Sequence, residues 1–360
     1  MPSFYDQLDD MSEEKLAEYE RVTDNFTAAG GMEEGPEQDA ALEAVYQDAK
    51  AIDLVMLMAG ARCYQVISLF NRREYAQGLR HFVPTMDLVA ERGDEIPDPL
   101  RTALETLVLA PLDAMVDNPD IPRTTIEAFL GQLETESRSR PAAATNYAFA
   151  RAFWHSHTGE RSAFEDWFDR WATSASDWWS QNKTMTISIT GALLDVFDPQ
   201  EALAHLERRS PTMVGDPDDR RDVLVTLAGT RSMCGNPDQA WKEYRQLLME
   251  MNESELPELV ERARTRSLVC AAVAAPWDSD DPAVSTALHL IESAERAQKL
   301  DTADAIEDTA ALAEHHLRRG DTAAGTRWRS VAEERARAFD ARNGNTFWST
   351  RLATRWFHDL

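Results

Sequence analysis

The segment Asp-Asp-Arg-Arg-Asp at residues 218–222 has the residue types and the spacing to bind a divalent cation. Asp218 and Asp222 are four positions apart, so on a helix their carboxylates lie on one face and could together hold Mg²⁺. The segment stands at the start of a predicted helix, where aspartates also interact favourably with the helix dipole. Two interpretations therefore remain open, a magnesium site and an ordinary helix start.

This D-D-x-x-D spacing is similar to the magnesium–diphosphate motif of isoprenoid synthases, which are all-helical enzymes. In that family the motif lines the middle of a long helix, whereas here it opens a short helix far along the chain. The second motif of the family, N/D-D-x-x-S/T-x-x-x-E, does not follow. We therefore expect no enzyme, no catalytic residue and no cofactor, and we keep a magnesium-dependent, synthase-like enzyme as the third hypothesis for function.

Other candidate metal ligands have spacings that do not suit a metal site. Residues 278–281 (Asp-Ser-Asp-Asp) resemble part of a calcium loop but lack its glycine and its terminal glutamate. Histidines one or two positions apart on a helix point to different faces and cannot chelate one ion well. The pairs concerned are His155 with His157 and His315 with His316. The sequence therefore predicts no metal ion.

Aromatic side chains are concentrated between residues 147 and 179, which contain five of the ten tryptophans. They could form the core between helices, or line a groove where a peptide or a small apolar ligand binds. The predicted ligand-binding residues are Asn146, Phe149, Phe153 and His157 along one side of a helix, with Arg262 and Arg266 on a later helix. The two arginines are one turn apart and could hold a carboxylate, with a solvated helix face as the alternative.

The elements that would position these residues are helical pairs, and the clearest pair lies at residues 218–252. Apolar residues recur there at steps of three and four, which predicts two amphipathic helices. Gly235 can adopt the left-handed conformation that ends the first helix, and Pro237 suits the first turn of the second. The apolar faces contain Leu224, Leu227 and Ala228 in the first helix, and Ala240, Tyr244 and Leu247 in the second.

This hairpin resembles a tetratricopeptide (TPR) repeat. The matching residues are Leu227-Ala228, the G-N-P-x-x-A turn that runs from Gly235 to Ala240, and the aromatic Tyr244 one turn later. The aromatic residue that the family has late in the first helix is replaced by an arginine, and the proline after the second helix is missing. The resemblance implies stacked helical pairs whose first helices line a concave binding surface.

Similar pairs follow one another along the chain at a period of about 40 residues. Small residues follow successive predicted turns at Ala163, Ala202, Ala240, Ala283 and Ala324. We therefore predict an all-α fold, an α-solenoid of about seven antiparallel helix pairs (a TPR-like superhelix) with a C-terminal capping helix at residues 347–358. A compact helical bundle is the alternative.

The beginning of the chain is expected to be a separate segment. An acidic helix at residues 10–28 precedes a glycine-rich stretch that predicts a flexible linker. We divide the chain into residues 1–36, the acidic helix with its linker, and residues 37–360, the TPR-like helical repeat domain. The first long helix of that domain is predicted at residues 38–70, with a break near Gly60.

The 360-residue chain has a net charge of −26, which disfavours nucleic-acid binding and is compatible with a basic protein or peptide partner. Residues 1–50 contain 14 acidic and 3 basic side chains, so their net charge is −11. The longest uncharged apolar runs are too short to span a membrane, and no signal peptide is expected. Three widely spaced cysteines predict reduced thiols in a cytoplasmic protein, and the high arginine and alanine content indicates a bacterial source.

These observations predict a non-enzymatic scaffold or regulator that binds a protein or peptide in its concave groove. The alternative is a homo-oligomeric structural protein that uses its aromatic surface for self-association. The oligomeric state and the partner are left open by the sequence.

Overall fold

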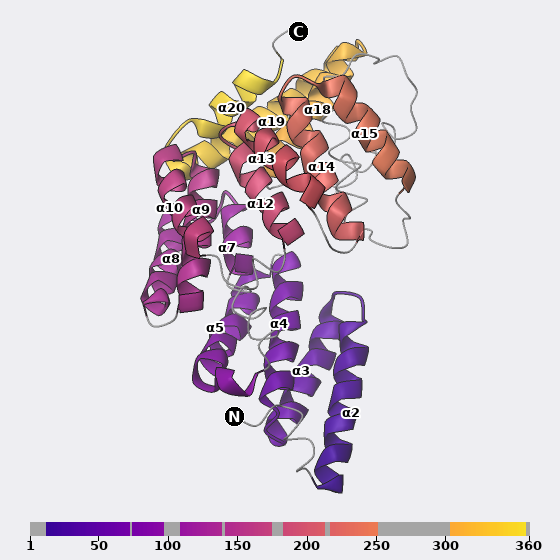
Figure 1. The fold of residues 1–360 in the computed structure, drawn as a ribbon, viewed down its shortest axis with the longest axis vertical. Coiled ribbons are helices and arrows are strands. Elements are labelled where there is room, and N and C mark those ends of the chain that lie inside the picture. The colour runs from indigo at the N-terminus through magenta and orange to yellow at the C-terminus, as the bar shows by residue number, and fades with distance from the viewer. Residues whose placement is uncertain are drawn as a thin grey trace. The chain divides into compact units, whose positions relative to one another are not determined.

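The computed structural model describes residues 12–72, 74–96, 109–138, 141–174, 183–212, 217–250 and 303–357. Within these ranges the chain forms fifteen α-helices and no strand, which confirms the all-α prediction (Figure 1). Helices that follow one another in the sequence pack pairwise. The chain divides into two compact units, unit 1 with Met1–Met115 and Gln132–Tyr147, and unit 2 with Val116–Gly131 and Ala148–Leu360.

Unit 1 begins with four helices that pack against one another. They are α2 (Glu13–Gly30), α3 (Pro36–Ala51), α4 (Val55–Asn71) and α5 (Tyr75–Arg92), followed by the short 3₁₀ helix η1 (Gly93–Glu95). Helix α3 packs against α4, α4 packs against α5, and α2 packs against both α3 and α4. The core that α2, α3 and α4 share consists of Val22, Ala29, Leu42, Val45, Ala49, Leu57, Met58 and Ala61. The acidic helix was expected to be separate from the repeat domain, whereas the apolar face of α2 packs in this core.

The single helix predicted at residues 38–70 is wrong, because the chain turns at residues 52–54 between α3 and α4. Asp53 adopts a left-handed backbone conformation (φ 60°), and the amide of the next residue donates to the carbonyl of Ala49 at 2.8 Å. This arrangement ends α3 without a glycine or a proline. The expected break near Gly60 is absent, since Gly60 lies inside α4.

The division between the units passes through α7 (Leu109–Val116), α8 (Arg123–Ser137) and α9 (Pro141–Thr158). Unit 2 continues with α10 (Arg161–Ser174), α12 (Lys183–Asp195), α13 (Pro199–Arg209), η2 (Ser210–Thr212), α14 (Pro217–Met233), α15 (Pro237–Glu250), α18 (Asp304–Arg318), α19 (Thr322–Asn343) and α20 (Phe347–Arg355). The main pairs are α12 with α13, α14 with α15, and α18 with α19, and α20 packs against α19. The last helix predicted at residues 347–358 is therefore observed as α20.

The hairpin of α14 and α15 has the geometry that its sequence predicts. Gly235 has a left-handed φ of 87° at the turn between the two helices. Ala240 and Tyr244 are fully buried, and the Tyr244 hydroxyl donates to the carbonyl of Val225 at 3.1 Å. The small residue thus lies where the helices pack, and the buried hydroxyl has the acceptor that it needs. The predicted helix pair that includes Ala283, at residues 259–297, lies outside the described residues.

Candidate functional site

The predicted ligand residues Asn146, Phe149, Phe153 and His157 lie along α9, where the first two are buried and the last two are partly buried. Asn146, in unit 1, and Phe149, in unit 2, are each 6% exposed. The Phe149 ring lies 5.2 Å from the ring of Trp171 in α10 and 6.2 Å from that of Phe153, which in turn lies 4.4 Å from the ring of His157. Phe149, Phe153 and His157 thus form a continuous row in unit 2, with Trp171 packed against Phe149. The use of this row for ligand binding stays a prediction.

Two further predicted sites cannot be placed in the same way. Arg262 and Arg266 lie outside the described residues, as does the loop at residues 278–281. The Asp-Asp-Arg-Arg-Asp segment falls in the first turns of α14, which begins at Pro217, although the side chains of its aspartates are not described. Over the described part of the chain, no group of three histidine, cysteine or acidic side chains is arranged to hold a metal ion.

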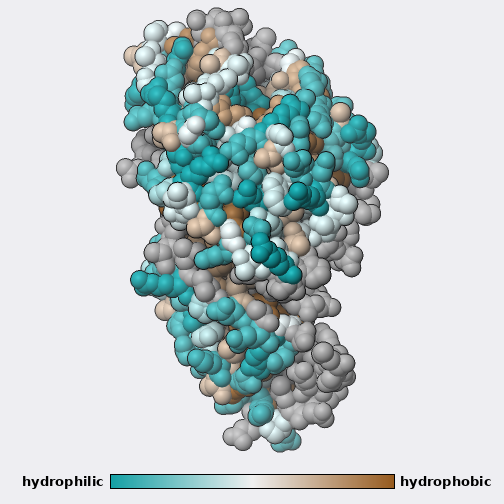
Figure 2. All heavy atoms as spheres, turned by 90° about the vertical axis from the view of Figure 1, so that its left-hand side faces the viewer, coloured by the Kyte–Doolittle hydropathy of each residue, from teal (hydrophilic) through white to brown (hydrophobic). Residues whose placement is uncertain are grey.

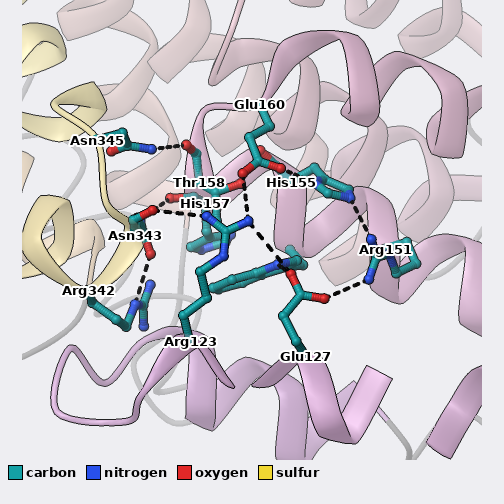
Figure 3. A network of polar contacts seen from close by, with 11 residues as sticks. Arg123, Glu127, Arg151, His155, His157, Thr158, Glu160, Arg342, Asn343 and Asn345 are labelled. Carbon is teal, nitrogen blue, oxygen red and sulfur yellow. Dashed lines mark hydrogen bonds and ion pairs between the residues drawn. The ribbon is translucent and has the colours of Figure 1, made fainter. Parts of the chain in front are cut away.

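Unit 2 contains a network of charged side chains between α8, α9 and the turn that precedes α10 (Figure 3). Glu160 accepts hydrogen bonds from Arg123 and from His155 Nδ1, both at 2.8 Å. Glu127 accepts from Arg151 at 2.9 Å and from the indole of Trp154 at 2.8 Å. The Arg151 guanidinium also lies 3.2 Å from His155 Nε2, so the two carboxylates are linked through the histidine (Figure 3).

The partners of His155 determine its protonation. A guanidinium can only donate and a carboxylate can only accept, so Nε2 accepts from Arg151 and Nδ1 carries the proton given to Glu160. His155 is therefore neutral, and burial together with the nearby Arg151 lowers its pKa. Burial alone would raise the pKa of Glu160, but hydrogen bonds from Arg123 and His155 hold it below its ordinary value.

Side chains from α19, the following turn and α20 complete this network by donating hydrogen bonds to backbone carbonyls at the ends of α7 and α9. Arg342 donates to the carbonyl of Val116 at 2.6 Å, and Asn345 donates to the carbonyl of Thr158 at 2.6 Å. The carbonyl of His157 accepts from Asn343 at 3.1 Å and from the Trp348 indole at 3.0 Å. These are carbonyls that a helix end leaves without intrahelical partners. The network therefore fixes helix ends. Both ring nitrogens of His155 are hydrogen-bonded to protein groups, so neither faces a substrate.

A different surface, in unit 1, presents apolar side chains to solvent. In the part of the chain that the structure describes, the exposed large hydrophobic residues are Leu16, Met32, Tyr64 and Ile67, with exposed fractions of 37%, 38%, 46% and 38%. Tyr64 and Ile67 are one turn apart on α4, and Met32 follows two residues after Gly30, against which the Tyr64 ring packs. We call Met32, Tyr64 and Ile67 the α4 patch.

Close contacts between α2 and α4 hold the α4 patch in place. A Cβ atom on Gly30 would lie 3.7 Å from Tyr64, and one on Gly60 would lie 3.2 Å from the Phe26 ring. The rings of Phe26 and Tyr64 meet edge to face at 5.6 Å. The buried Gln38 amide donates to the carbonyl of Met32 at 3.1 Å, which fixes the turn after α2. The apolar side chains are thus exposed on a constrained backbone.

A partly buried arginine, Arg62, fixes the orientation of α4 toward α3 and α5. Arg62 donates to Gln65 at 2.6 Å and to His81 Nδ1 at 2.9 Å, and it also pairs with Glu43. Its guanidinium lies 3.6 Å from the centre of the Tyr46 ring, a cation–π contact. Because His81 Nδ1 must accept from the guanidinium, the ring is neutral, and burial and Arg62 both lower its pKa. One side of α4 is therefore locked by polar contacts while Tyr64 and Ile67 remain exposed.

The surroundings of the α4 patch are acidic. Glu33 and Glu34 follow Met32 directly in the chain, Glu37 lies three residues beyond Glu34, and all three are exposed. On the face drawn in Figure 2, hydrophilic atoms predominate and hydrophobic atoms form small separate areas. An apolar patch beside exposed carboxylates suits a partner with apolar and basic side chains. This surface was not predicted from the sequence, although the apolar residues on more than one face of α4 could have indicated it.

Comparison with known proteins gives no matching family model and no matching curated protein. Among the helices that the structure describes, none has both the length and the apolarity needed to cross a membrane.

Proposed function

We propose that the protein is a non-enzymatic, protein-binding scaffold whose helical hairpins form a TPR-like solenoid. The single observation that supports binding best is the α4 patch, with Met32, Tyr64 and Ile67 exposed between 38% and 46% on a fixed backbone. A monomeric surface seldom keeps apolar side chains together without a function. The hairpins formed by consecutive helices support the repeat architecture, and residues 259–297 would add a further pair.

The partner of the α4 patch is a basic segment with apolar side chains, such as an amphipathic helix. Its apolar side chains would cover the patch, and its lysines or arginines would pair with Glu33, Glu34 and Glu37, which are all exposed. Covering three half-exposed side chains contributes on the order of 2 kcal/mol, which corresponds to roughly a thirtyfold gain in affinity. Electrostatic attraction would mainly raise the association rate and would weaken with salt.

The test compares glutamate substitutions in the α4 patch with one outside it. Ile67→Glu and Met32→Glu place a charge on the patch, while Leu16→Glu places the same charge on a residue of α2 with nearly the same exposure. We expect proteins captured by the wild type and by Leu16→Glu to be lost with the patch variants. Titration of the purified partner should then show at least tenfold weaker binding to Ile67→Glu.

Two results would contradict the proposal. One is an equal loss with Leu16→Glu, which would make the effect one of general charge. The other is a captured set that does not change in either patch variant. If the captured protein is a second copy of this chain, the alternative of a self-associating structural protein replaces the scaffold.

A further inference from the structure

A cleft of about 450 Å³ lies in unit 2 between α19 and α20. Arg329, Glu333 and Arg337 line one side at every fourth position of α19, so they share one face of that helix. Since a helix rises 1.5 Å per residue, the Cα atoms of the two arginines are about 12 Å apart along the helix axis. The other side and the end of the cleft are lined by Ser349, Leu352, Ala353, Trp356 and Phe357.

The cleft has more positive than negative charge. Glu333 lies between the two arginines and pairs with both, at 3.0 Å from Arg329 Nε and 3.9 Å from Arg337 Nη1. One carboxylate thus serves two guanidinium groups, which leaves a net positive charge in a chain whose overall charge is −26. The Arg329 guanidinium also lies 4.6 Å from the centre of the Phe357 ring, so it is held at one end of the cleft. Arg337 is 64% exposed and can turn its free donors toward a ligand.

The remaining lining supplies an apolar surface. Leu352 and Trp356 are 4% and 3% exposed, so their side chains form a floor fixed by packing.

We infer that this cleft binds an acidic peptide segment in which carboxylates alternate with bulky apolar side chains. Both guanidinium groups reach the one carboxylate of Glu333, so they match carboxylates two residues apart in an extended chain, which lie about 7 Å apart because such a chain rises about 3.3 Å per residue. The apolar side chains next to these carboxylates contact Leu352 and Trp356. A small free anion would leave the floor uncovered. The site is independent of the α4 patch, which has the opposite charge preference.

The experiment uses the full chain and a fluorescein-labelled heptapeptide, Glu-Leu-Asp-Phe-Glu-Leu-Asp, with binding followed by fluorescence anisotropy. We expect saturable binding that weakens at higher salt, because the contacts are charged. The double substitution Arg329→Ala/Arg337→Ala should weaken binding at least tenfold. The control Arg138→Ala removes an arginine that is 73% exposed, pairs with Glu134 and lies outside the cleft, and it should leave the affinity unchanged.

Two further peptides separate the contributions of charge and apolar contact. A heptapeptide with serine in place of the leucines and phenylalanine should bind at least fivefold more weakly, as should one with lysine in place of the acidic residues. The inference is overturned if the labelled peptide does not bind, or if the double substitution and Arg138→Ala have equal effects. It is also overturned if the serine peptide binds as tightly as the apolar one.

Discussion

Replacing Glu160 by alanine tests whether the network in unit 2 stabilises the fold in the way its geometry indicates. Glu160 accepts one hydrogen bond from Arg123 and one from His155, both at 2.8 Å. The two donors differ in their access to water, because the Arg123 side chain is 36% exposed and that of His155 is 5% exposed. The same substitution therefore has unequal consequences for its two partners.

The magnitude follows from this difference in exposure. Arg123 can recover water as a partner, so losing its bond to Glu160 destabilises the protein by about 0.5–1 kcal/mol. The N–H of His155 cannot reach water, and leaving it without an acceptor costs about 1–3 kcal/mol. We expect Glu160→Ala to lower the free energy of unfolding by about 2–3 kcal/mol. The coupling of Glu160 to His155 should exceed its coupling to Arg123.

Double-mutant cycles measured by urea denaturation check this order. The matched control is the pair formed by Arg161 and Glu165, whose atoms lie 2.7 Å apart but whose side chains are 52% and 55% exposed. The control pair should couple by about 0.5 kcal/mol or less, because both of its members are solvated. If the coupling of Glu160 to His155 is no larger than that of the control pair, burial does not determine the strength of this network.

Two other predictions concern packing and pH. Gly325→Ala should destabilise the protein by about 1–3 kcal/mol in urea denaturation, because its Cβ would lie 2.5 Å from the Leu317 side chain. The control Gly131→Ala, whose Cβ would have nothing within 4 Å, should be neutral or stabilising by a few tenths of a kcal/mol. Equal effects of the two substitutions would refute the close approach of α18 and α19. Burial, helped by His316 and Arg319, lowers the pKa of His315 from 6.5 to about 4, so the unfolded chain binds the proton first and stability falls as the pH drops from 6.5 to 4. This titration contributes about 3 kcal/mol, and the difference between the pH–stability curves of the wild type and His315→Gln should show it.

Local features of the fold were predictable because they depend on residues close together in the sequence. The turn between α14 and α15 needs only a residue that tolerates a left-handed conformation, and Gly235 there has a φ of 87°. Asp198 stands directly before Pro199 and has a residue type that favours the cap position of a helix, and its carboxylate accepts from the amides of Gln200 and Glu201 at 3.0 and 3.1 Å. Helix existence and hairpin pairing follow from apolar periodicity in the same way.

Features that depend on distant contacts were not predictable. The turn at residues 52–54 has no glycine or proline, and it forms where Asp53 takes the left-handed conformation, which glycine adopts most readily and aspartate adopts more often than most other residues. The carbonyls at the end of α9 are met by Asn343 and Asn345, which lie almost 190 residues further along the chain. No local pattern in either segment indicates this pairing.

The candidate site was predicted only in its residue types. The aromatic row along α9 is real, but sequence periodicity gives the side of a helix and not what covers it. Phe149 is covered by Trp171 of α10. For the α4 patch the error is the opposite one. Apolar residues such as Tyr64 and Ile67 are expected to be buried, and only the placement of the neighbouring helices shows that they are exposed.

Photo-cross-linking in living cells tests the central claim, that the α4 patch is a protein-binding surface, most directly. A photoreactive phenylalanine analogue replaces Ile67 in one variant and Leu16 in another, two positions with exposed fractions of 38% and 37%. The account predicts one predominant adduct at position 67, whose cross-linked peptide is basic and apolar, and no such adduct at position 16. The absence of an adduct at position 67, or the same adducts at both positions, would contradict it.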